Sequence, residues 1–152
     1  MDVNIRRMTV TDIDSVMVVE TLSFTIPWSR NAFIMEASND LAVYFVAEVD
    51  ACPIGYIGLW KVVDEGHITN VAVHPDFRRN HIGCALLDTL LAYANEQQLV
   101  TLFLEVRESN VEAQALYAQY GFEFIGRRRG YYTDNGEDAL LMEKVLKQVN
   151  IC

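Results

Sequence analysis

The sequence predicts one α/β domain, spanning residues 1–152, in which helices cover a single mixed β-sheet. Its 152 residues, 51% of them hydrophobic, suffice for one domain with a substantial core and leave little room for two. Segments with the apolar spacing of helices alternate along the chain with segments typical of strands. Three strands follow one another with only short turns between them, which favours an antiparallel arrangement in that part of the sheet.

The N-terminal half is expected to contain a strand, two helices and then three strands. Thr11 is the expected cap of the first helix and Ser29 that of the second, because each hydroxyl can accept a hydrogen bond from an unpaired backbone N–H. Pro27 and Trp28 separate the two helices. The expected bounds are 3–8 for the strand, 11–24 and 30–38 for the helices, and 42–49, 54–63 and 67–73 for the three strands.

Helices and strands alternate in the C-terminal half. A helix between two strands is long enough to connect parallel neighbours, so the sheet is expected to be parallel only where a helix intervenes. The turn at residues 134–137 instead favours a hairpin of the last two strands. The expected bounds are helix 82–94, strand 100–106, helix 110–121, strand 122–132 and strand 138–146.

The charge of the chain bears on the class of partner. With 12 Lys and Arg against 21 Asp and Glu, the formal net charge is -9. Such a balance argues against direct nucleic-acid binding, which requires a basic face, and favours a cationic partner. Solubility alone would also explain an acidic surface.

Metal binding and membrane insertion are not expected. Cys52, Cys84 and Cys152 are too far apart for paired metal ligands or a disulfide framework, and the three histidines fall on a strand, a loop and a helix start. The chain opens without the apolar core of a secretory signal and contains no run of roughly 20 apolar residues. We therefore expect a cytoplasmic protein with no membrane partner, present as a monomer or weak dimer.

The start of the helix at residue 82 is a candidate anion site. A strand ends at Val73, Pro75 breaks it, and the helix that follows presents unpaired backbone N–H groups and the positive end of its dipole. Arg78 and Arg79 add donors nearby. The sequence has neither G-x-x-x-x-G-K-[ST] nor G-x-G-x-x-G, so this would be a phosphate cradle of another type or an ordinary cap beside two surface arginines.

Four segments resemble the GNAT acetyltransferase family. RRNHIGCALL is similar to the R/Q-x-x-G-x-G/A signature that binds the pyrophosphate of acetyl-CoA, and LEVRESNVEAQALYAQYGF to the second half of the cofactor region. GYYTDNGEDALLMEKVL resembles the C-terminal segment of the family's protein N-terminal acetyltransferases. FTIPWSRNAF resembles the substrate loop of the bacterial RimI-type branch, which acetylates the N-terminal alanine of a small-subunit ribosomal protein.

The resemblance covers most of the chain and implies a fold, a co-substrate and a reaction. The implied fold is one mixed, mostly antiparallel twisted sheet with a splayed parallel central pair and helices on both faces. The implied reaction transfers the acetyl group of acetyl-CoA to a protein N-terminus, in this branch that of a ribosomal protein; the acidic balance of the chain would suit a basic ribosomal-protein peptide. A lysine side-chain or small-molecule amine acetyltransferase, and a non-catalytic acyl-CoA-binding module, remain alternatives.

One position departs from the family signature. His81 occupies the place of its first glycine. If this position requires a positive φ, a histidine fits at some cost in free energy. The alternative is an ordinary φ with the imidazole ring near a phosphate.

The resemblance assigns cofactor binding mainly to main-chain groups. Residues 71–73 would pair with the pantetheine arm as an added strand does, and amides around Val73 would form part of the oxyanion environment. Asn110 would contact the cofactor and can also cap its own helix. The implied cofactor residues are Val71, Ala72, Val73, Arg78, Arg79, Asn80, His81, Ile82, Gly83, Cys84, Ala85, Asn110 and Tyr117.

Moving an acetyl group from a thioester to an amine requires a neutral amine and a protonated leaving thiol. An N-terminal amine has a pKa of about 7.7 to 8.0, so a modest base suffices. The resemblance assigns the base to Glu105 and the acid to Tyr117. The alternatives are a rim or ion-paired carboxylate for Glu105 and helix packing for Tyr117, as we expect for Tyr120.

Aromatic residues are the expected walls of the peptide site. By the resemblance, Tyr131 and Tyr132, at the end of the strand 122–132, lie over the first residues of the peptide. Phe24, Pro27 and Trp28 would wall the pocket from the other side. The acidic residues expected to attract a basic peptide, against a local positive run at 127–129, are Glu108, Glu112, Asp134, Glu137 and Asp138.

Overall fold

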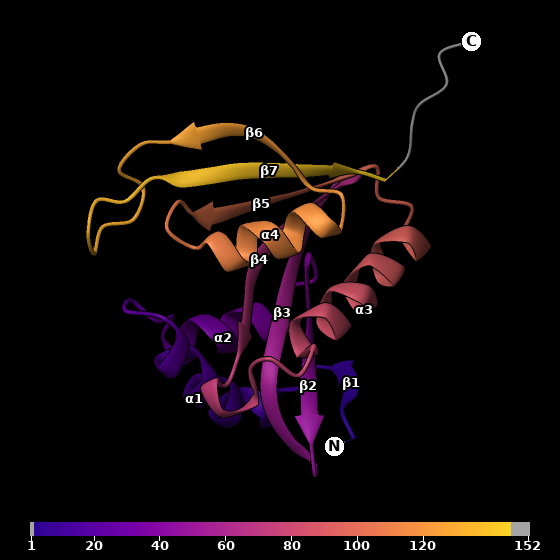
Figure 1. Cartoon of the computed structure of the whole chain (residues 1–152). Coiled ribbons are helices and arrows are strands. Elements are labelled where there is room, and N and C mark those ends of the chain that lie inside the picture. Colours follow the sequence, from indigo (N-terminus) through magenta and orange to yellow (C-terminus); the bar gives the residue numbers. More distant parts are fainter. Residues whose placement is uncertain (1, 147–152) are drawn as a thin grey trace.

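The computed structural model describes residues 2–146, which form one seven-stranded sheet with helices on both faces (Figure 1). The sheet order is β1-β2-β3-β4-β5-β7-β6. The strands are β1 (Asn4–Arg7), β2 (Ala42–Val49), β3 (Cys52–Val62), β4 (Glu65–Val73), β5 (Thr101–Arg107), β6 (Glu123–Arg128) and β7 (Ala139–Val145). The helices are α1 (Ile13–Ser23), α2 (Arg30–Ala37), α3 (Ile82–Glu96) and α4 (Val111–Gln119), with 3-10 turns at Val10–Asp12 and Pro75–Phe77.

The predicted pattern of strand pairing is confirmed. β2, β3 and β4 form an antiparallel meander, and β5, β7 and β6 form a second antiparallel group. The two groups meet at β4 and β5, the parallel pair in the described sheet, which α3 connects. The chain thus forms the mixed, mostly antiparallel sheet that the sequence predicts.

β4 and β5 pair over only part of their length. Their register runs from Glu65 opposite Thr101 to Ile68 opposite Leu104, although β4 continues to Val73 and β5 to Arg107. Beyond Ile68 and Leu104 the two strands diverge, and Figure 1 shows β5 crossing the direction of β4 steeply. The separation leaves backbone groups of both central strands free of a ladder partner on that side.

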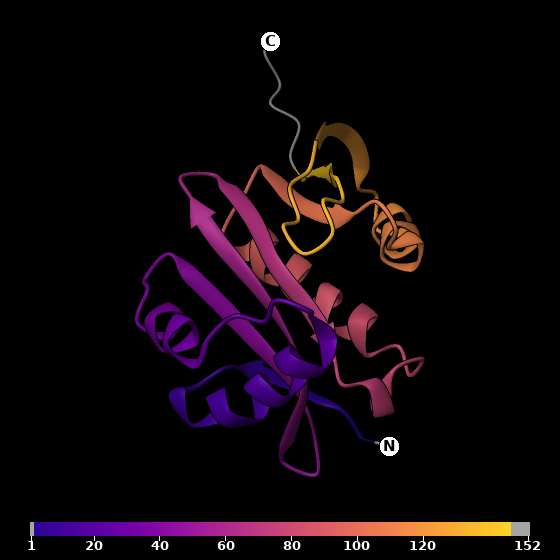
Figure 2. The ribbon, with the colours of Figure 1, turned by 90° about the vertical axis from the view of Figure 1, so that its left-hand side faces the viewer.

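The alternation of side chains along the central strands creates two cores. In β2, Phe45 and Ala47 face the core beneath α3 and α4, whereas Tyr44 and Val46 face the core beneath α1 and α2. Leu90 of α3 is buried in the first core. Figure 2 shows α1 and α2 in front of the central strands and α3 behind them.

Two of the three predicted helix caps are confirmed. The Ser29 hydroxyl accepts the Ala32 N–H at 3.1 Å, and the Asn110 side chain accepts the Ala113 N–H at 3.1 Å. Thr11 does not cap α1, so that prediction is wrong.

A 3-10 turn over Val10–Asp12 precedes α1, and Asp12 organises it by accepting the Thr9 N–H at 2.8 Å. The carboxylate of Asp12 is held by Arg6 of β1, 2.8 Å away. Because Thr11 lies inside this turn, it cannot occupy the cap position of α1.

The last strands are shorter than predicted. β6 ends at Arg128, so Tyr131 and Tyr132 do not end the strand 122–132 but lie in the connection to β7. Gly130, with a φ of +60°, turns the chain between Arg128 and the tyrosine pair. The tyrosines are thereby placed beside β5.

Within residues 2–146, no helix is long and apolar enough to cross a bilayer. Cys52 and Cys84 are free thiols, and Cys152 lies outside the described residues. Among the same residues 2–146, no three His, Cys, Asp or Glu side chains lie close enough together to hold a metal ion.

Candidate functional site

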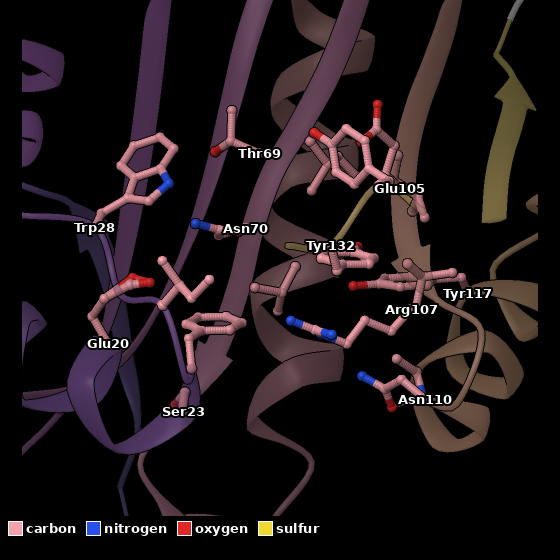
Figure 3. A pocket seen from close by; sticks show the side chains of 18 of the residues that line it. Glu20, Ser23, Trp28, Thr69, Asn70, Glu105, Arg107, Asn110, Tyr117 and Tyr132 are labelled. Carbon is pink, nitrogen blue, oxygen red and sulfur yellow. Dashed lines mark hydrogen bonds between the residues drawn. The ribbon is translucent and has the colours of Figure 1, made fainter. Parts of the chain in front are cut away.

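A cavity of about 550 Å³ lies where β4 and β5 separate. The end of α1 and the segment after it form one wall, and β5, α4 and the β6–β7 connection form the other (Figure 3). Residues 69–71 of β4 and 104–107 of β5 lie at its centre. The incomplete pairing of the two strands therefore creates the opening.

The cavity gathers most of the predicted catalytic and substrate residues. Glu105, Tyr117, Asn110 and Val71 line it, as do Phe24, Trp28, Tyr131 and Tyr132. Pro27 does not line the cavity and is exposed. Its place is taken by Ile26, which the sequence did not single out.

The start of α3 has the backbone required of an anion cradle. The N–H groups of residues 79–84 donate no hydrogen bond within the described chain, as expected of a helix N-terminus. Arg78, Arg79, Asn80 and His81 are exposed around this row. The Arg78 Nε donates to the Val73 carbonyl at 3.1 Å, which fixes the loop to the end of β4.

His81 adopts the left-handed conformation, with a φ of 59° and a ψ of 23°. Of the two alternatives for this position, the positive φ is therefore confirmed. Arg79 is left-handed as well, with a φ of 67°. Two non-glycine residues in this region cost conformational free energy, which is typical of a loop whose shape is required for binding.

Helix α4 packs directly beside the start of α3. A Cβ on Gly83 would lie 3.7 Å from the Leu116 side chain, an ordinary contact distance. The Tyr120 hydroxyl lies 3.1 Å from the Cys84 carbonyl and 2.9 Å from Asp88 of α3. Tyr120 thus links the two helices, in keeping with the packing role expected for it.

Glu105 occupies the cavity wall on β5. Leu104 and Val106 are buried, and Glu105 points to the opposite side, as the alternation predicts. Its side chain is 29% exposed, and its Oε1 lies 3.4 Å from the Arg128 Nε. A hydrogen bond with Glu105 is also the main cause that raises the pKa of Tyr131. Glu105 is thus both a cavity carboxylate and an ion-pair partner.

Tyr117 is the buried phenol of the cavity. Burial, with a smaller effect of Tyr132, raises the pKa of Tyr117 to about 12. Its ring contacts Phe122, with the centroids 5.9 Å apart. The phenol is therefore protonated at neutral pH. Tyr117 also lines the cavity.

Arg107, which the sequence interpretation missed, organises the wall beside Tyr132. Its guanidinium lies 4.0 Å from the Tyr132 ring centroid and pairs with Asp134 at 2.7 Å and Glu137 at 3.3 Å. Thr25 donates to Asp134 at 2.7 Å, so the segment after α1 is joined to the β6–β7 connection. These contacts hold the two walls of the cavity together.

The structure changes the electrostatic interpretation of the acidic residues. Asp134 and Glu137 are paired with Arg107, while Glu108 and Asp138 are paired with Arg127. Four of the five carboxylates expected to attract a basic peptide are therefore engaged in ion pairs, in which two arginines offset about half of their charge.

Three polar residues near the end of α1 were also missed. Glu20 and Ser23 lie one turn apart and line the cavity with Asn70 of β4. Glu20 is 1% exposed and accepts from the Tyr56 hydroxyl. A glutamate among apolar residues on a helix face was the available signal, because such a side chain is rarely buried without a purpose.

A second cavity of about 380 Å³ adjoins the first. The two share Trp28, Glu105 and Tyr131 as lining residues. Trp60 and Phe103 add aromatic rings to the lining of the second cavity, beside aliphatic side chains such as Ile125. A chain that entered the first cavity could therefore extend past Glu105 along a continuous surface.

Comparison with known proteins agrees with this geometry. The profile of the acetyltransferase (GNAT) family matches residues 13–122. A Bacillus subtilis protein named as a candidate [ribosomal protein bS18]-alanine N-acetyltransferase is 43% identical over 139 residues, which cover 91% of this chain and 92% of the relative. The Escherichia coli [ribosomal protein bS18]-alanine N-acetyltransferase is 36% identical over 142 residues, covering 91% and 94%.

The solved structures include a protein of the same fold. The crystal structure of the ribosomal-protein-S18-alanine N-acetyltransferase from Escherichia coli superposes with a TM-score of 0.91 and 31% identity. The match covers 99% of this chain and 97% of the crystallised chain. The similarity thus extends over both cores and the cavity between β4 and β5.

Proposed function

Because the chain belongs to the GNAT family and is an acetyl-CoA-dependent N-acetyltransferase, we propose that it acetylates the N-terminal α-amine of a protein. The specific substrate we propose is the N-terminal alanine of ribosomal protein bS18, on which the similar proteins are named to act. The observation that carries the proposal is the cavity between the splayed strands, which offers a carboxylate, a buried phenol and aromatic walls in one place. A substrate of this kind implies a cytoplasmic protein.

The main chain fits acetyl-CoA, the co-substrate. The open N–H row at residues 79–84 suits a pyrophosphate, since it supplies several donors and the positive end of the α3 dipole. The unpaired edge of β4 at residues 71–73 suits the peptide-like pantetheine arm. The remaining proposed cofactor residues, Ile82, Gly83, Cys84 and Ala85, would bind through these amides, and Asn110 from the α4 cap.

Glu105 would accept the proton of the α-amine as that nitrogen attacks the acetyl carbonyl. An N-terminal amine near pKa 8 loses its proton readily, so a carboxylate in the cavity wall suffices, directly or through a water molecule. The neighbouring Arg128 and Tyr131 would orient this carboxylate. Because the ion pair with Arg128 would orient the Glu105 carboxylate, it is compatible with the proposed role of Glu105 as the base.

Tyr117 would donate a hydrogen bond to the leaving sulfur. With a pKa of about 12 the phenol holds its proton at neutral pH. Full transfer to a thiolate of pKa about 8.5 would cost about 5 kcal/mol, and burial of the thiolate reduces that cost by raising its own pKa. Tyr117 would therefore stabilise the leaving thiolate by a hydrogen bond that strengthens as the thiolate forms, at a lower cost in free energy than full proton transfer.

The peptide would enter between the two aromatic walls. Phe24 and Trp28 lie on the α1 side, and Tyr131 and Tyr132 lie on the other. The tyrosine rings meet edge to face, with centroids 5.1 Å apart. Residues after the first would follow the adjoining cavity past Trp60 and Phe103.

The proposal is tested with short peptides. The purified protein is incubated with acetyl-CoA and peptides that begin with alanine, and with N-terminally blocked peptides that carry one lysine. Mass spectrometry of fragments then locates the acetyl group. We expect acetylation of the free N-terminus of the alanine peptides; acetylation of the lysine peptides alone would contradict the proposal.

A further inference from the structure

We infer that Glu20 and Ser23 form an acceptor subsite, in which Glu20 binds the α-ammonium group of the incoming N-terminus and Ser23 binds the carbonyl of its first residue. The inference rests on the proposed function and deepens it. The subsite lies on the α1 wall of the cavity, across from Glu105 (Figure 3). It would recognise a polypeptide N-terminus by its α-ammonium group and the carbonyl of its first residue, two groups that lie together at a chain end.

Glu20 is held in place but not saturated. The Tyr56 hydroxyl lies 3.1 Å from Oε1 and 3.0 Å from Oε2 of Glu20. A phenol has one proton to donate, whereas a carboxylate can accept about four hydrogen bonds. Tyr56 therefore fixes the orientation of Glu20 and leaves acceptor capacity on a group that lines the cavity.

Glu20 has no cationic partner. Across residues 2–146, no Lys, Arg or His lies within ion-pair distance of its carboxylate. Glu105, in contrast, is paired with Arg128, and the cavity cation Arg107 is paired with Asp134. Burying a carboxylate without a cationic partner costs free energy. A cation that reaches this carboxylate therefore gains an electrostatic attraction that no group of the protein already uses.

Ser23 supplies the second, independent observation. Its Oγ is buried and has no hydrogen-bond partner in the described chain, although it lines the cavity. Buried hydroxyls are nearly always paired, so an unpaired one beside a cavity is available to a group that enters the cavity. As Ser23 follows Glu20 by three residues on α1, the two groups lie on the same face.

The combination of an acceptor and a donor selects among amines. An N-terminal residue carries an ammonium group and, three bonds from its nitrogen, a carbonyl oxygen. The ammonium group donates to Glu20 and the carbonyl accepts from Ser23. A lysine side chain carries the ammonium group without the carbonyl, so it would satisfy only half of the subsite.

The charge state of Glu20 makes the subsite sensitive to pH. Burial raises the pKa of Glu20 to about 7, and the Tyr56 hydrogen bond acts in the opposite direction. The ionisable groups that interact with it are Tyr56 on β3 and Tyr44 on β2, whose own pKa values are raised by burial, so neither carries charge. The elements packed on α1, namely β3, α2, β4 and the two 3-10 turns, place no cation within ion-pair distance of the Glu20 carboxylate. Peptide affinity should therefore rise from pH 6 to pH 8 as Glu20 ionises.

The test compares Glu20→Gln and Ser23→Ala with Glu36→Gln. Glu36, on the neighbouring helix α2, is a matched control, because it accepts from the buried Tyr44 of β2 and lines neither cavity. For Glu20→Gln we expect the KM of an alanine-first peptide to rise about tenfold, with kcat within about twofold, since a charged hydrogen bond is lost. Ser23→Ala should raise that KM about threefold. The KM of acetyl-CoA should not change in any variant.

The pH profile separates binding from a structural role. In the parent protein, the peptide KM should fall between pH 6 and pH 8. In Glu20→Gln the part of this fall near pH 7 should disappear, which leaves only the titration of the peptide amine itself near pH 8. A Glu20→Gln protein with parental peptide KM and parental pH dependence overturns the inference, as does a loss of kcat at constant KM. If Glu20→Gln does not fold, an unchanged peptide KM in Ser23→Ala overturns it. A parent protein that acetylates no N-terminus contradicts the proposed function as well, so the two failures are distinguishable.

Discussion

The candidate site has a proposed co-substrate side and a proposed acceptor side, which are built from different parts of the chain. The cavity lining includes Val71 of β4 but none of residues 79–84, so the proposed co-substrate side extends beyond the cavity. On the co-substrate side, the groups available for binding are backbone N–H groups of residues 79–84 and the unpaired edge of β4. On the acceptor side, they are side chains from separate elements, such as Glu20, Glu105 and Tyr132. The main-chain side requires particular backbone shapes, whereas the other side requires particular side chains and can change its substrate without changing the fold. Four variants test this division, in order of decreasing expected effect.

Glu105→Gln should produce the largest effect. The amide keeps the shape of the side chain but cannot accept the proton of the attacking amine, so kcat should fall about 10²- to 10³-fold. Steady-state kinetics with an alanine-first peptide measures this fall. Arg128→Gln, which removes the ion pair and leaves the carboxylate, is the control and should reduce kcat far less. A Glu105→Gln enzyme with parental kcat would remove Glu105 from the mechanism.

Glu20→Gln should stabilise the protein at high pH. The pKa of Glu20 is about 7 in the folded protein against 4.5 for the ordinary side chain, so the folded state binds this proton more tightly than the unfolded state does. The contribution of Glu20 to the free energy of unfolding is therefore fully present below pH 4.5. It is lost as the pH rises through about 7, which lowers the free energy of unfolding by about 3 kcal/mol. Urea unfolding should show that the free energy of unfolding of Glu20→Gln exceeds that of the parent by far more at pH 8 than at pH 5.

The matched comparison for this measurement is Glu36→Gln. Its carboxylate lies on α2 and is bound by Trp60 and Tyr44. The variant should not reproduce a stabilisation that grows with pH. Equal pH dependence of the unfolding free energy in the parent and Glu20→Gln would contradict the assigned burial.

Gly83→Asp should weaken the co-substrate side alone. There is room for a side chain, because a Cβ would lie 3.7 Å from Leu116, but a carboxylate beside the N–H row repels phosphate. The KM of acetyl-CoA should rise about 10- to 30-fold, while the peptide KM changes little. Gly83→Ala provides the steric control and should behave nearly as the parent. If Gly83→Ala and Gly83→Asp raised the KM of acetyl-CoA equally, the cause would be the added side-chain volume and not the negative charge.

His81→Gly should have the smallest effect. His81 has a φ of 59°, which glycine adopts without steric cost, so the free energy of unfolding should increase by about 0.5 to 1 kcal/mol. Chemical denaturation measures the change. A loss of stability would instead indicate that the imidazole makes a favourable contact in this loop.

The main-chain side could largely be predicted from the sequence. Local signals determine it, namely a strand ending at Val73, a proline, and a helix that starts at Ile82 with a signature around it. The strand at 42–49 and the cap at Asn110 were likewise correct, since their signals lie within a few residues. His81 shows the limit, because sequence spacing alone does not give a value of φ.

The side-chain side could be predicted only in part. Glu105 and the tyrosine pair were found through a family resemblance, but the strand end before Tyr131 was misplaced because Gly130 turns the chain earlier. The proposed Glu20 subsite was not found, because only the folded sheet brings Tyr56 of β3 onto Glu20 and opens the cavity beside α1. Asp134 and Glu137 looked free for the same reason, since their partner Arg107 lies 27 and 30 residues away in the sequence.

The division between the two sides is tested most directly by isothermal titration of acetyl-CoA into the parent protein and into Glu105→Gln. The account predicts binding to both with the same Kd within about twofold, since the main-chain side is untouched by the substitution. Absence of binding to the parent, or a Kd that rises with the loss of the Glu105 carboxylate, would contradict it.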